Sequence, residues 1–422
     1  MQSFQSRQED HMKSKIIRVL AICLSCLGFS AHVAAQSATA QTAATSAATC
    51  QFSVWTAGVN YPVGTVVQYP ANGSFYKEVN AGTNGSDGTD PTISTWYWQP
   101  TTCSGTTTPP STSFIYSPYF YSGDFGGNQM NTTVTGSSQL LVNVIPAKLQ
   151  AITWAFATGN CGSENWNGVS ASAFASANVG SFVNAGKKYI VSTGGAGASF
   201  LCTSDANFAK FIQTYNSANL LGIDFDIENG QSQSDINNLV ARVSTAQATY
   251  PNLRFSFTIA TDGGNESNSL GGTGVMVMTA IQNYGLKNYT INLMTMDFAS
   301  SGQENASLCT LNSSGKCNMG QSTISAAESL HNYWKVPYSQ IEVTPMIGGN
   351  DSIDETFTLA DAVTVANYAL SKKIAGIHFW AFSRDRDCAP ATTDGNSSDT
   401  CNNYGKAGTL GYTNQFISAL GL

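Results

Sequence analysis

The chain is poor in charged side chains and carries no cluster of basic ones beyond its first segment. Charged residues make up 11% of the 422 residues, less than half of the share of about 25% that is usual in globular proteins. The net charge is −7. We therefore expect neither nucleic acid nor an anionic membrane as a partner. A neutral, polar ligand suits this composition better.

Histidine is almost absent, and only His331 and His378 lie beyond residue 35. A Ser-His-Asp or Cys-His mechanism would have to use one of them, and no G-x-S-x-G elbow accompanies either. Beyond residue 35 there is also no C-x-x-C, which weakens metal ligation as a role for the cysteines. We expect no metal and no cofactor.

No apolar run is long enough to cross a membrane comfortably. The longest near the start, residues 19–29, follows a basic stretch at 13–18 and precedes the small residues 33–35. This order is typical of a secretory signal peptide. We predict a signal peptide at 1–35 and a secreted, extracellular protein.

Eight cysteines remain after residue 35. An even number in an exported chain indicates disulfides, although eight cysteines allow 105 pairings. Local pairs in chain order are the simplest choice: Cys50–Cys103, Cys161–Cys202, Cys309–Cys317 and Cys388–Cys401.

Two low-complexity segments divide the chain. Residues 36–49 are an Ala/Thr/Ser/Gln spacer, and residues 104–112 are a Thr/Pro-rich linker. The segment 50–103 between them is dense in aromatics, has short β-like runs, and is small enough to depend on its disulfide. Residues 113–422 form a separate, larger domain.

In this larger domain, apolar strand-like runs alternate with helical periodicity. The runs are 114–122, 150–158, 188–195, 220–228, 253–262, 289–298, 341–349 and 374–383. Eight strands alternating with helices indicate an α/β fold, a (β/α)8 TIM barrel, with the small disulfide-stapled β module at its N-terminal side. An open doubly wound sheet is the alternative.

Polar or otherwise unusual residues occur where these runs end, as catalytic groups do in such barrels. They are Gly194, Gly195, Asp226, Glu228, Asp262, Asp297, Asn350 and Arg384.

The run 220–228 carries three acids at alternate positions, Asp224, Asp226 and Glu228. Alternate side chains of a strand share a face, so these carboxyl groups stand roughly 6–7 Å apart along it. Acids this close push their pKa values apart, so one of them can hold a proton and act as a general acid. Glu228, nearest the C-terminal end, is the predicted donor. A solvated edge strand and a divalent-metal site are the alternatives.

The run resembles the D-x-x-D-x-D-x-E signature of glycoside hydrolase family 18, the chitinase family. Ser192–Gly195 resembles the S-x-G-G of the third strand, and Met294–Asp297 resembles the M-x-Y-D of the sixth. Trp380 on the eighth strand is similar to the tryptophan beneath the central sugar.

This resemblance implies substrate-assisted retention, an exception to the two-carboxylate scheme. Glu228 would protonate the glycosidic oxygen while the acetamido oxygen of the substrate attacks the anomeric carbon. Asp226 would hold the acetamido N–H, Asp224 would tune Asp226, and Asp297 would position the acetamido group.

Two positions depart from the family pattern. Leu221 replaces the first Asp of the signature, and Met296 replaces the tyrosine that binds the acetamido oxygen. The lost donor is worth about 1–3 kcal/mol at a charged centre. Tyr116 and Tyr119 on the first strand are the candidate replacements.

Residues 50–103 resemble carbohydrate-binding modules of families 5 and 12. The resemblance rests on aromatic positions that include Trp55, Tyr69 and the cluster Trp96, Tyr97 and Trp98. Strand alternation predicts that the two tryptophans of this cluster share one face, on which sugar rings can stack.

Together these features predict a monomeric chitinase that acts on chitin or N-acetylglucosamine oligosaccharides. Two alternatives stay open: a non-hydrolytic chitin-binding lectin on the same barrel, and an endo-β-N-acetylglucosaminidase acting on N-glycans. Glu228 speaks against the lectin and Met296 for it, while the chitin-type module speaks against the N-glycan enzyme.

Overall fold

The computed structural model describes residues 52–55, 61, 63–69, 74–80, 89–101, 114–124, 127–228, 230–388 and 398–422. The predicted signal peptide, spacer and linker lie outside the described residues, as do Cys50 and Cys103 and therefore the disulfide predicted between them. The small N-terminal part and the large domain are each described by themselves.

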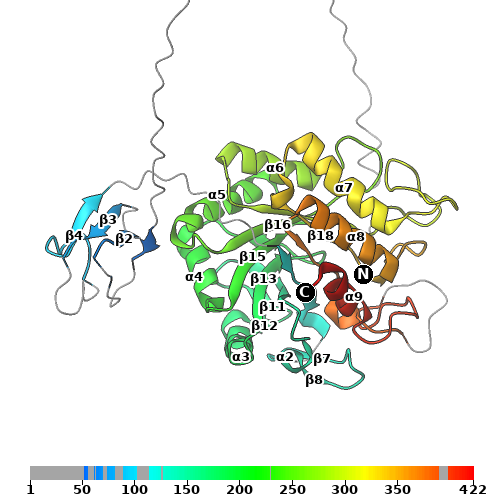
Figure 1. Cartoon of the computed structure of the whole chain (residues 1–422), viewed down its shortest axis with the longest axis horizontal. Coiled ribbons are helices and arrows are strands. Elements are labelled where there is room, and N and C mark those ends of the chain that lie inside the picture. Colours follow the sequence, from blue (N-terminus) through cyan, green and yellow to red (C-terminus); the bar gives the residue numbers. More distant parts are fainter. Residues whose placement is uncertain are drawn as a thin grey trace, which may run out of the picture. The chain divides into compact units, whose positions relative to one another are not determined.

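The N-terminal part is a four-stranded sheet (Figure 1). Its strands follow the chain order β1 (Ser53–Val54), β2 (Val66–Gln68), β3 (Phe75–Glu78) and β4 (Trp98–Thr101). β1 and β2 are parallel, and the other pairs are antiparallel. Four buried residues form its core: Tyr61, Val67, Tyr76 and Trp98.

The large domain is built around one sheet of parallel strands. They are β5 (Ile115–Tyr116), β6 (Tyr119–Tyr121), β9 (Ala151–Ala157), β13 (Lys188–Gly194), β15 (Leu220–Asp226), β16 (Arg254–Ala260), β17 (Thr290–Met294), β18 (Ile341–Thr344) and β21 (Gly376–Ile377). The order is β5-β21-β18-β17-β16-β15-β13-β9-β6. Every strand lies within a run predicted from the sequence, so the eight predicted strands are confirmed.

The sheet closes on itself through residues 115–121. β5 pairs with β21 at one end of the strand order, and β6 pairs with β9 at the other, yet both belong to the same run of chain. The run bonds to both neighbours along the same residues: Ser117 N and Tyr119 N donate to Ile377 O and Phe379 O at 3.2 Å and 3.0 Å, whereas Pro118 O, between them, accepts from Thr153 N at 2.8 Å. The sheet is therefore a (β/α)8 barrel, and the open doubly wound sheet is excluded.

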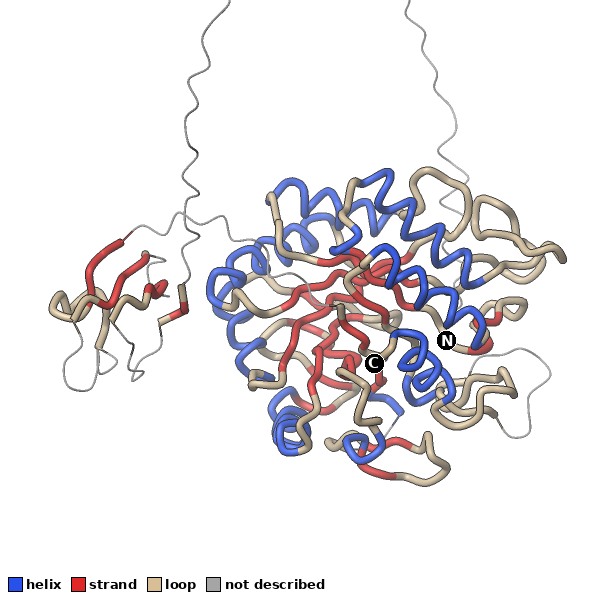
Figure 2. The backbone as a smooth tube through the Cα atoms, viewed as in Figure 1, coloured by secondary structure: helices blue, strands red, loops and turns tan. Residues whose placement is uncertain are grey.

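Helices surround the barrel, as Figure 2 shows. They are α2 (Leu141–Val144), α3 (Ala171–Asn184), α4 (Asp205–Tyr215), α5 (Gln233–Thr249), α6 (Gly272–Tyr284), α7 (Met319–Trp334), α8 (Leu359–Lys372) and α9 (Gly411–Leu420). Capping boxes start two of them, with Ser232 and Asp235 at α5 and Thr358 and Asp361 at α8. In each, the side-chain oxygens bind backbone N–H groups that the first helical turn leaves unpaired.

The loops contain short strands and 3-10 turns. They are β7 (Asn131–Thr132), β8 (Gln139–Leu140), β10 (Gly159–Asn160), β11 (Asn165–Trp166), β12 (Val169–Ser170), β14 (Phe200–Leu201), β19 (Gly348–Gly349), β20 (Thr356–Phe357), η2 (Ser122–Asp124), η3 (Tyr338–Gln340) and η4 (Phe382–Arg384).

Three of the predicted disulfides are confirmed: Cys161–Cys202, Cys309–Cys317 and Cys388–Cys401. The first joins the loops after β9 and β13, directly beyond the paired strands β10 and β14. Each disulfide fixes a loop that follows a barrel strand. Among the described residues, no helix combines the length and the apolar character that a membrane span requires.

Candidate active site

The three acids of β15 lie at increasing exposure toward the end of the strand. Asp224 is 1% exposed and Asp226 is 6% exposed, whereas Glu228, two residues beyond the strand, is half-buried. The alternate residues Ile223 and Phe225 are fully buried in the apolar layer between sheet and helices. The predicted alternation is therefore confirmed within β15, for residues 223–226, and the solvated edge strand is excluded.

Four hydroxyl groups donate to the carboxylate of Asp224. Oδ1 accepts from Ser256 Oγ at 2.6 Å and from Thr258 Oγ1 at 2.7 Å. Oδ2 accepts from Ser192 Oγ at 2.6 Å and from Tyr119 OH at 2.8 Å. The donors come from β13, β16 and β6, so Asp224 points into the barrel interior. These donors replace the hydration that the buried carboxyl group loses.

Two glycines at the end of β13, Gly194 within the strand and Gly195 directly after it, allow the chain to approach Asp226 closely. Both have positive φ, +86° at Gly194 and +86° at Gly195. A Cβ on Gly194 would lie 2.1 Å from Asp226 O, and Gly195 N donates to that oxygen at 3.2 Å. Only glycine tolerates both the conformation and this contact. The S-x-G-G run thus positions the backbone of Asp226.

Trp380 follows β21 as part of an aromatic group at the same end of the barrel. Its ring stacks on Phe156 with centroids 5.7 Å apart and planes at 11°. Tyr119 and Tyr121 approach it at 6.1 Å and 6.0 Å. A Cβ on Gly195 would lie 2.7 Å from the Phe156 ring. Trp380 is half-buried, so part of the ring remains available to a ligand.

Asp297 is held by the loop that follows β18. Its Oδ1 accepts from Ser352 N at 2.9 Å, and its own N–H donates to Asn350 Oδ1 at 3.3 Å. Its φ is +49°, a conformation that few non-glycine residues adopt outside functional or tightly held sites. Burial, and then the neighbouring Asp351, raises the pKa of Asp297 to about 7. The group can therefore act as a hydrogen-bond donor near neutral pH.

Neither candidate tyrosine replaces the donor that is lost at Met296. Tyr116 faces the helices, where its hydroxyl donates to Thr413 O at 3.4 Å and its ring packs on Phe416. Tyr119 is buried and its hydroxyl donates to Asp224. The structure corrects this expectation because strand alternation turns Tyr116 outward. Tyr121 shares the inward face of Tyr119 and lies half-buried beside Trp380, nearer the end of the strand.

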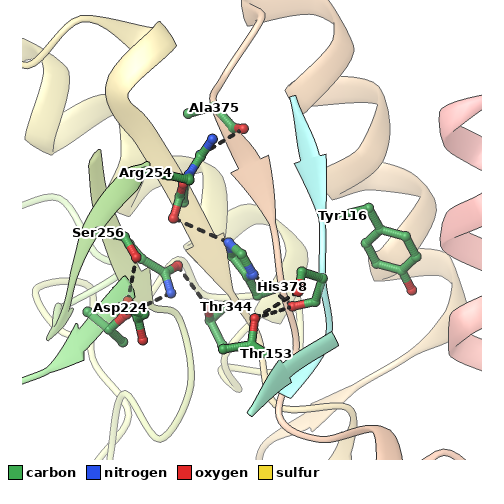
Figure 3. A network of polar contacts seen from close by, with 12 residues as sticks. Tyr116, Thr153, Asp224, Arg254, Ser256, Thr344, Ala375 and His378 are labelled. Atoms are coloured by element: carbon green, nitrogen blue, oxygen red, sulfur yellow. Dashed lines mark hydrogen bonds and ion pairs between the residues drawn. The ribbon is translucent and has the colours of Figure 1, made fainter. Parts of the chain in front are cut away.

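A second polar layer lies deeper in the barrel (Figure 3). Glu342 forms ion pairs with Arg254 and, at 3.2 Å, with His378 Nε2. Nδ1 of His378 lies 2.7 Å from Ser117 O. A carbonyl only accepts, so Nδ1 carries a proton, and burial lowers the pKa of His378 well below its usual value.

This layer, and the donors around Asp224, were not found from the sequence. They come from seven of the eight predicted strand runs, which no local motif connects. A signal was present, because polar residues occupy alternate positions within otherwise apolar strand runs. These residues are Ser117, Thr153, Ser192, Arg254, Ser256, Thr258, Asn292, Glu342, Thr344 and His378.

In the aromatic cluster of the small sheet, the exposed and buried side chains differ from those predicted. Trp96 is 67% exposed, whereas Trp98 is 1% exposed and its Nε1 donates to Thr89 O at 3.0 Å. Tyr97 is half-buried. The prediction that both tryptophans share a binding face is wrong, because residues 95–97 form a turn and strand alternation begins only at Trp98. Trp98 is a core residue.

Among the residues that the structure describes, no group of three or more His, Cys, Asp and Glu side chains is arranged to hold a metal ion. The described acids of the candidate site instead interact with hydroxyl and backbone donors.

Comparisons with known proteins agree with this geometry. The family model described as Glycosyl hydrolases family 18 matches residues 119–348. The chain is 28% identical over 222 residues to the probable bifunctional chitinase/lysozyme of Escherichia coli (strain K12), covering 48% of this chain and 24% of that protein. It is 27% identical over 226 residues to Endochitinase 11 of Metarhizium anisopliae, covering 49% of this chain and 41% of that protein.

The matches therefore span less than half the length of either curated relative. The catalytic domain of the hyperthermophilic chitinase from Pyrococcus furiosus has a similar fold, with a TM-score of 0.55 and 22% identity over 73% of this chain and 95% of that one. Because the family model spans more than half of the 422 residues and includes β6 through β18 with the acid-bearing strand β15, the chain belongs to glycosyl hydrolases family 18.

Proposed function

We propose that the protein is a chitinase that hydrolyses β-1,4-linked N-acetylglucosamine polymers, with Glu228 as general acid and base. The observation that carries this proposal is the graded burial of three acids on β15. Asp224 accepts hydrogen bonds from four hydroxyl groups. Asp226 lies two residues further along, at the end of the strand, and Glu228 lies beyond the strand and is half-buried. Such a gradient lets neighbouring acids differ in protonation state.

In the proposed reaction, Glu228 protonates the glycosidic oxygen as the acetamido oxygen of the substrate attacks the anomeric carbon. The glycosidic bond breaks and an oxazolinium ion forms. Asp226 accepts a hydrogen bond from the acetamido N–H and stabilises the positive charge. Glu228 then removes a proton from water, which opens the oxazolinium ion and yields the retained product.

Three further residues would bind the sugar. Trp380 offers its ring face beneath a pyranose, supported from behind by Phe156. Asp297, with its raised pKa of about 7, can donate to the acetamido oxygen. Met296 offers the acetamido group an apolar neighbour in place of a hydroxyl donor, so we expect slow turnover.

We propose that residues 50–103 form a chitin-binding module of the family 5 and 12 type. Trp96 is the residue best placed to stack on a polysaccharide, since 67% of its surface is exposed, and Tyr97 lies beside it in the same turn. The sequence of residues 1–35 supports secretion into the extracellular space, and we propose that the protein acts there as a monomer.

The test is mass spectrometry of the products formed from N-acetylglucosamine oligosaccharides by the unaltered protein, by Glu228→Gln and by the control Glu266→Gln. Glu266 is an exposed acid on the loop after β16. We expect cleavage by the unaltered protein and by the control, and a loss of about 10²–10⁴-fold in Glu228→Gln.

Equal product formation by Glu228→Gln would refute the assigned role of this residue. Binding of oligosaccharides without any products would indicate the lectin. Release of glycans from an N-glycoprotein, without cleavage of chitin oligosaccharides, would indicate the N-glycan enzyme.

A further inference from the structure

Asn292 lies in the middle of β17, fully buried, and points into the barrel beside the donors of Asp224. Its Nδ2 lies 2.9 Å from Tyr119 OH and 2.9 Å from Thr258 Oγ1. Both hydroxyls also contact Asp224. Asn292 therefore reaches the carboxylate only through these two hydroxyl groups.

The direction of each hydrogen bond follows from counting protons. An amide nitrogen donates two hydrogen bonds and accepts none, so both hydroxyl oxygens accept from Nδ2. Each hydroxyl has a single proton, and the acceptors left within its reach are Asp224 and the other hydroxyl, 3.0 Å away; the charged carboxylate is the stronger acceptor. The Tyr119 and Thr258 hydroxyls are thus oriented toward Asp224 by Asn292.

The reverse orientation of the amide is unfavourable. With Oδ1 in place of Nδ2, each hydroxyl has one proton for two acceptors, Asn292 and Asp224. If the proton goes to Asp224, Oδ1 faces the hydroxyl oxygen without a proton; if it goes to Asn292, the contact with Asp224 has none. The oxygen of Tyr119 would then face Asp224 Oδ2 at 2.8 Å, and that of Thr258 would face Oδ1 at 2.7 Å, with no proton between them. In the favourable orientation the amide oxygen also has a partner, because Thr344 Oγ1 donates to Asn292 Oδ1 at 2.7 Å (Figure 3 labels Thr344 and Asp224).

We propose that Asn292 is a positioning residue for the hydrolytic reaction: it orients Tyr119 and Thr258 so that the Asp224 carboxyl group keeps four hydroxyl donors. A proton that enters the row of acids then resides on Asp226 or Glu228, where the reaction uses it. This inference rests on the proposed function of these acids.

Other charged and titratable groups also surround Asp224. Asp226 is its neighbour on β15, Arg254 lies on β16, Glu342 on β18 and His378 beyond β21, and the charge of Asp224 acts on both Arg254 and His378. A variant that adds charge at position 292 would perturb all of them. A test must therefore separate orientation from charge.

Two variants make this separation. Asn292→Asp keeps the shape but turns the donor into an acceptor and adds a charge, whereas Asn292→Leu removes the donor and adds no charge. We expect kcat to fall about tenfold or more in Asn292→Asp. We expect the acidic limb of kcat/KM to move to higher pH in both, by roughly one unit in Asn292→Asp.

Thr290→Val is the matched control. Thr290 is buried on the same strand, two residues before Asn292, and its hydroxyl has no hydrogen-bond partner among the described residues. Its pH profile should match that of the unaltered protein. In a double-mutant cycle, Asn292→Leu and Tyr119→Phe should be less than additive in kcat, since the first acts through the second.

An Asn292→Leu profile that superimposes on that of the unaltered protein would overturn the proposal, even if Asn292→Asp shifts, since charge alone would then explain the shift. Additive effects of Asn292→Leu and Tyr119→Phe would overturn it as well. If Asn292→Asp does not fold, Asn292→Leu alone decides. Absence of hydrolysis by the unaltered protein would instead refute the proposed function itself.

Discussion

Replacing Gly194 with alanine should lower the activity of the candidate active site, although Gly194 has no side chain and acts only through the position of Asp226. The φ of Gly194 is +86°, a region that costs an L-residue roughly 1–2 kcal/mol. The new Cβ would also lie 2.1 Å from Asp226 O. Overpacking against a backbone atom costs typically about 1–3 kcal/mol. We expect the free energy of unfolding to fall by about 2–5 kcal/mol in total.

The effect on activity follows from the direction of this clash. Contacts below 3.0 Å essentially never occur for a real Cβ, so the strand carrying Asp226 must move by about 1 Å. A displacement of this size in a reacting group can reduce the rate by about 10²-fold. We therefore expect Gly194→Ala to lower kcat/KM on N-acetylglucosamine oligosaccharides by about that factor.

The matched control is Gly197→Ala in the same loop, where a Cβ would meet nothing within 4 Å and φ lies outside the positive region. Urea unfolding and oligosaccharide kinetics should be measured on both variants. Unaltered stability and activity in Gly194→Ala would refute the reasoning. Equal losses in both variants would show that the loop is generally sensitive and that the approach to Asp226 is not the cause.

Three further outcomes are expected. Glu342→Leu leaves the buried Arg254 charge without its partner and should lower the free energy of unfolding in urea by about 3–5 kcal/mol, whereas Glu342→Gln, which can still donate to the histidine, should lower it less. Burial raises the pKa of Glu355 from 4.5 to about 8; the folded state therefore binds the extra proton, and stability should fall as pH rises between these values. Glu355→Gln should flatten this dependence in a series of melting temperatures, and a slope equal to that of the unaltered protein would contradict it. Replacing Cys161 and Cys202, 41 residues apart, with serine should lower the free energy of unfolding by about 4 kcal/mol, and an unchanged urea midpoint would count against that role.

Much of the large domain could be predicted from the sequence because its signals are local. Each strand shows a short apolar run, and each disulfide of the described residues joins cysteines that are neighbours in chain order. The acids of residues 224–228 follow the two-residue repeat of a strand. The common inward face of Asp224 and Asp226 therefore needed no knowledge of the remaining chain.

The local residue pattern does not show which strands are neighbours in the sheet. It also does not show at which residue a strand ends. The run 115–121, which pairs with β21 on one side and with β9 on the other, closes the barrel and brings Tyr119 to Asp224, 105 residues away in the chain. Trp98 was predicted to share a face with Trp96. This prediction was wrong because the turn before β4 interrupts the strand alternation on which it was based.

The sequence by itself thus determined the elements, their order and the acid-bearing face of β15, since these depend on residue spacing within a few positions. Only the tertiary structure decided how Asp224 is satisfied, that Tyr116 faces the helices and that Asn292 directs two hydroxyls from other strands. The reason is physical: a buried carboxylate is stabilised by donors converging in space, and such donors can come from any strand that the closed barrel brings within about 3 Å.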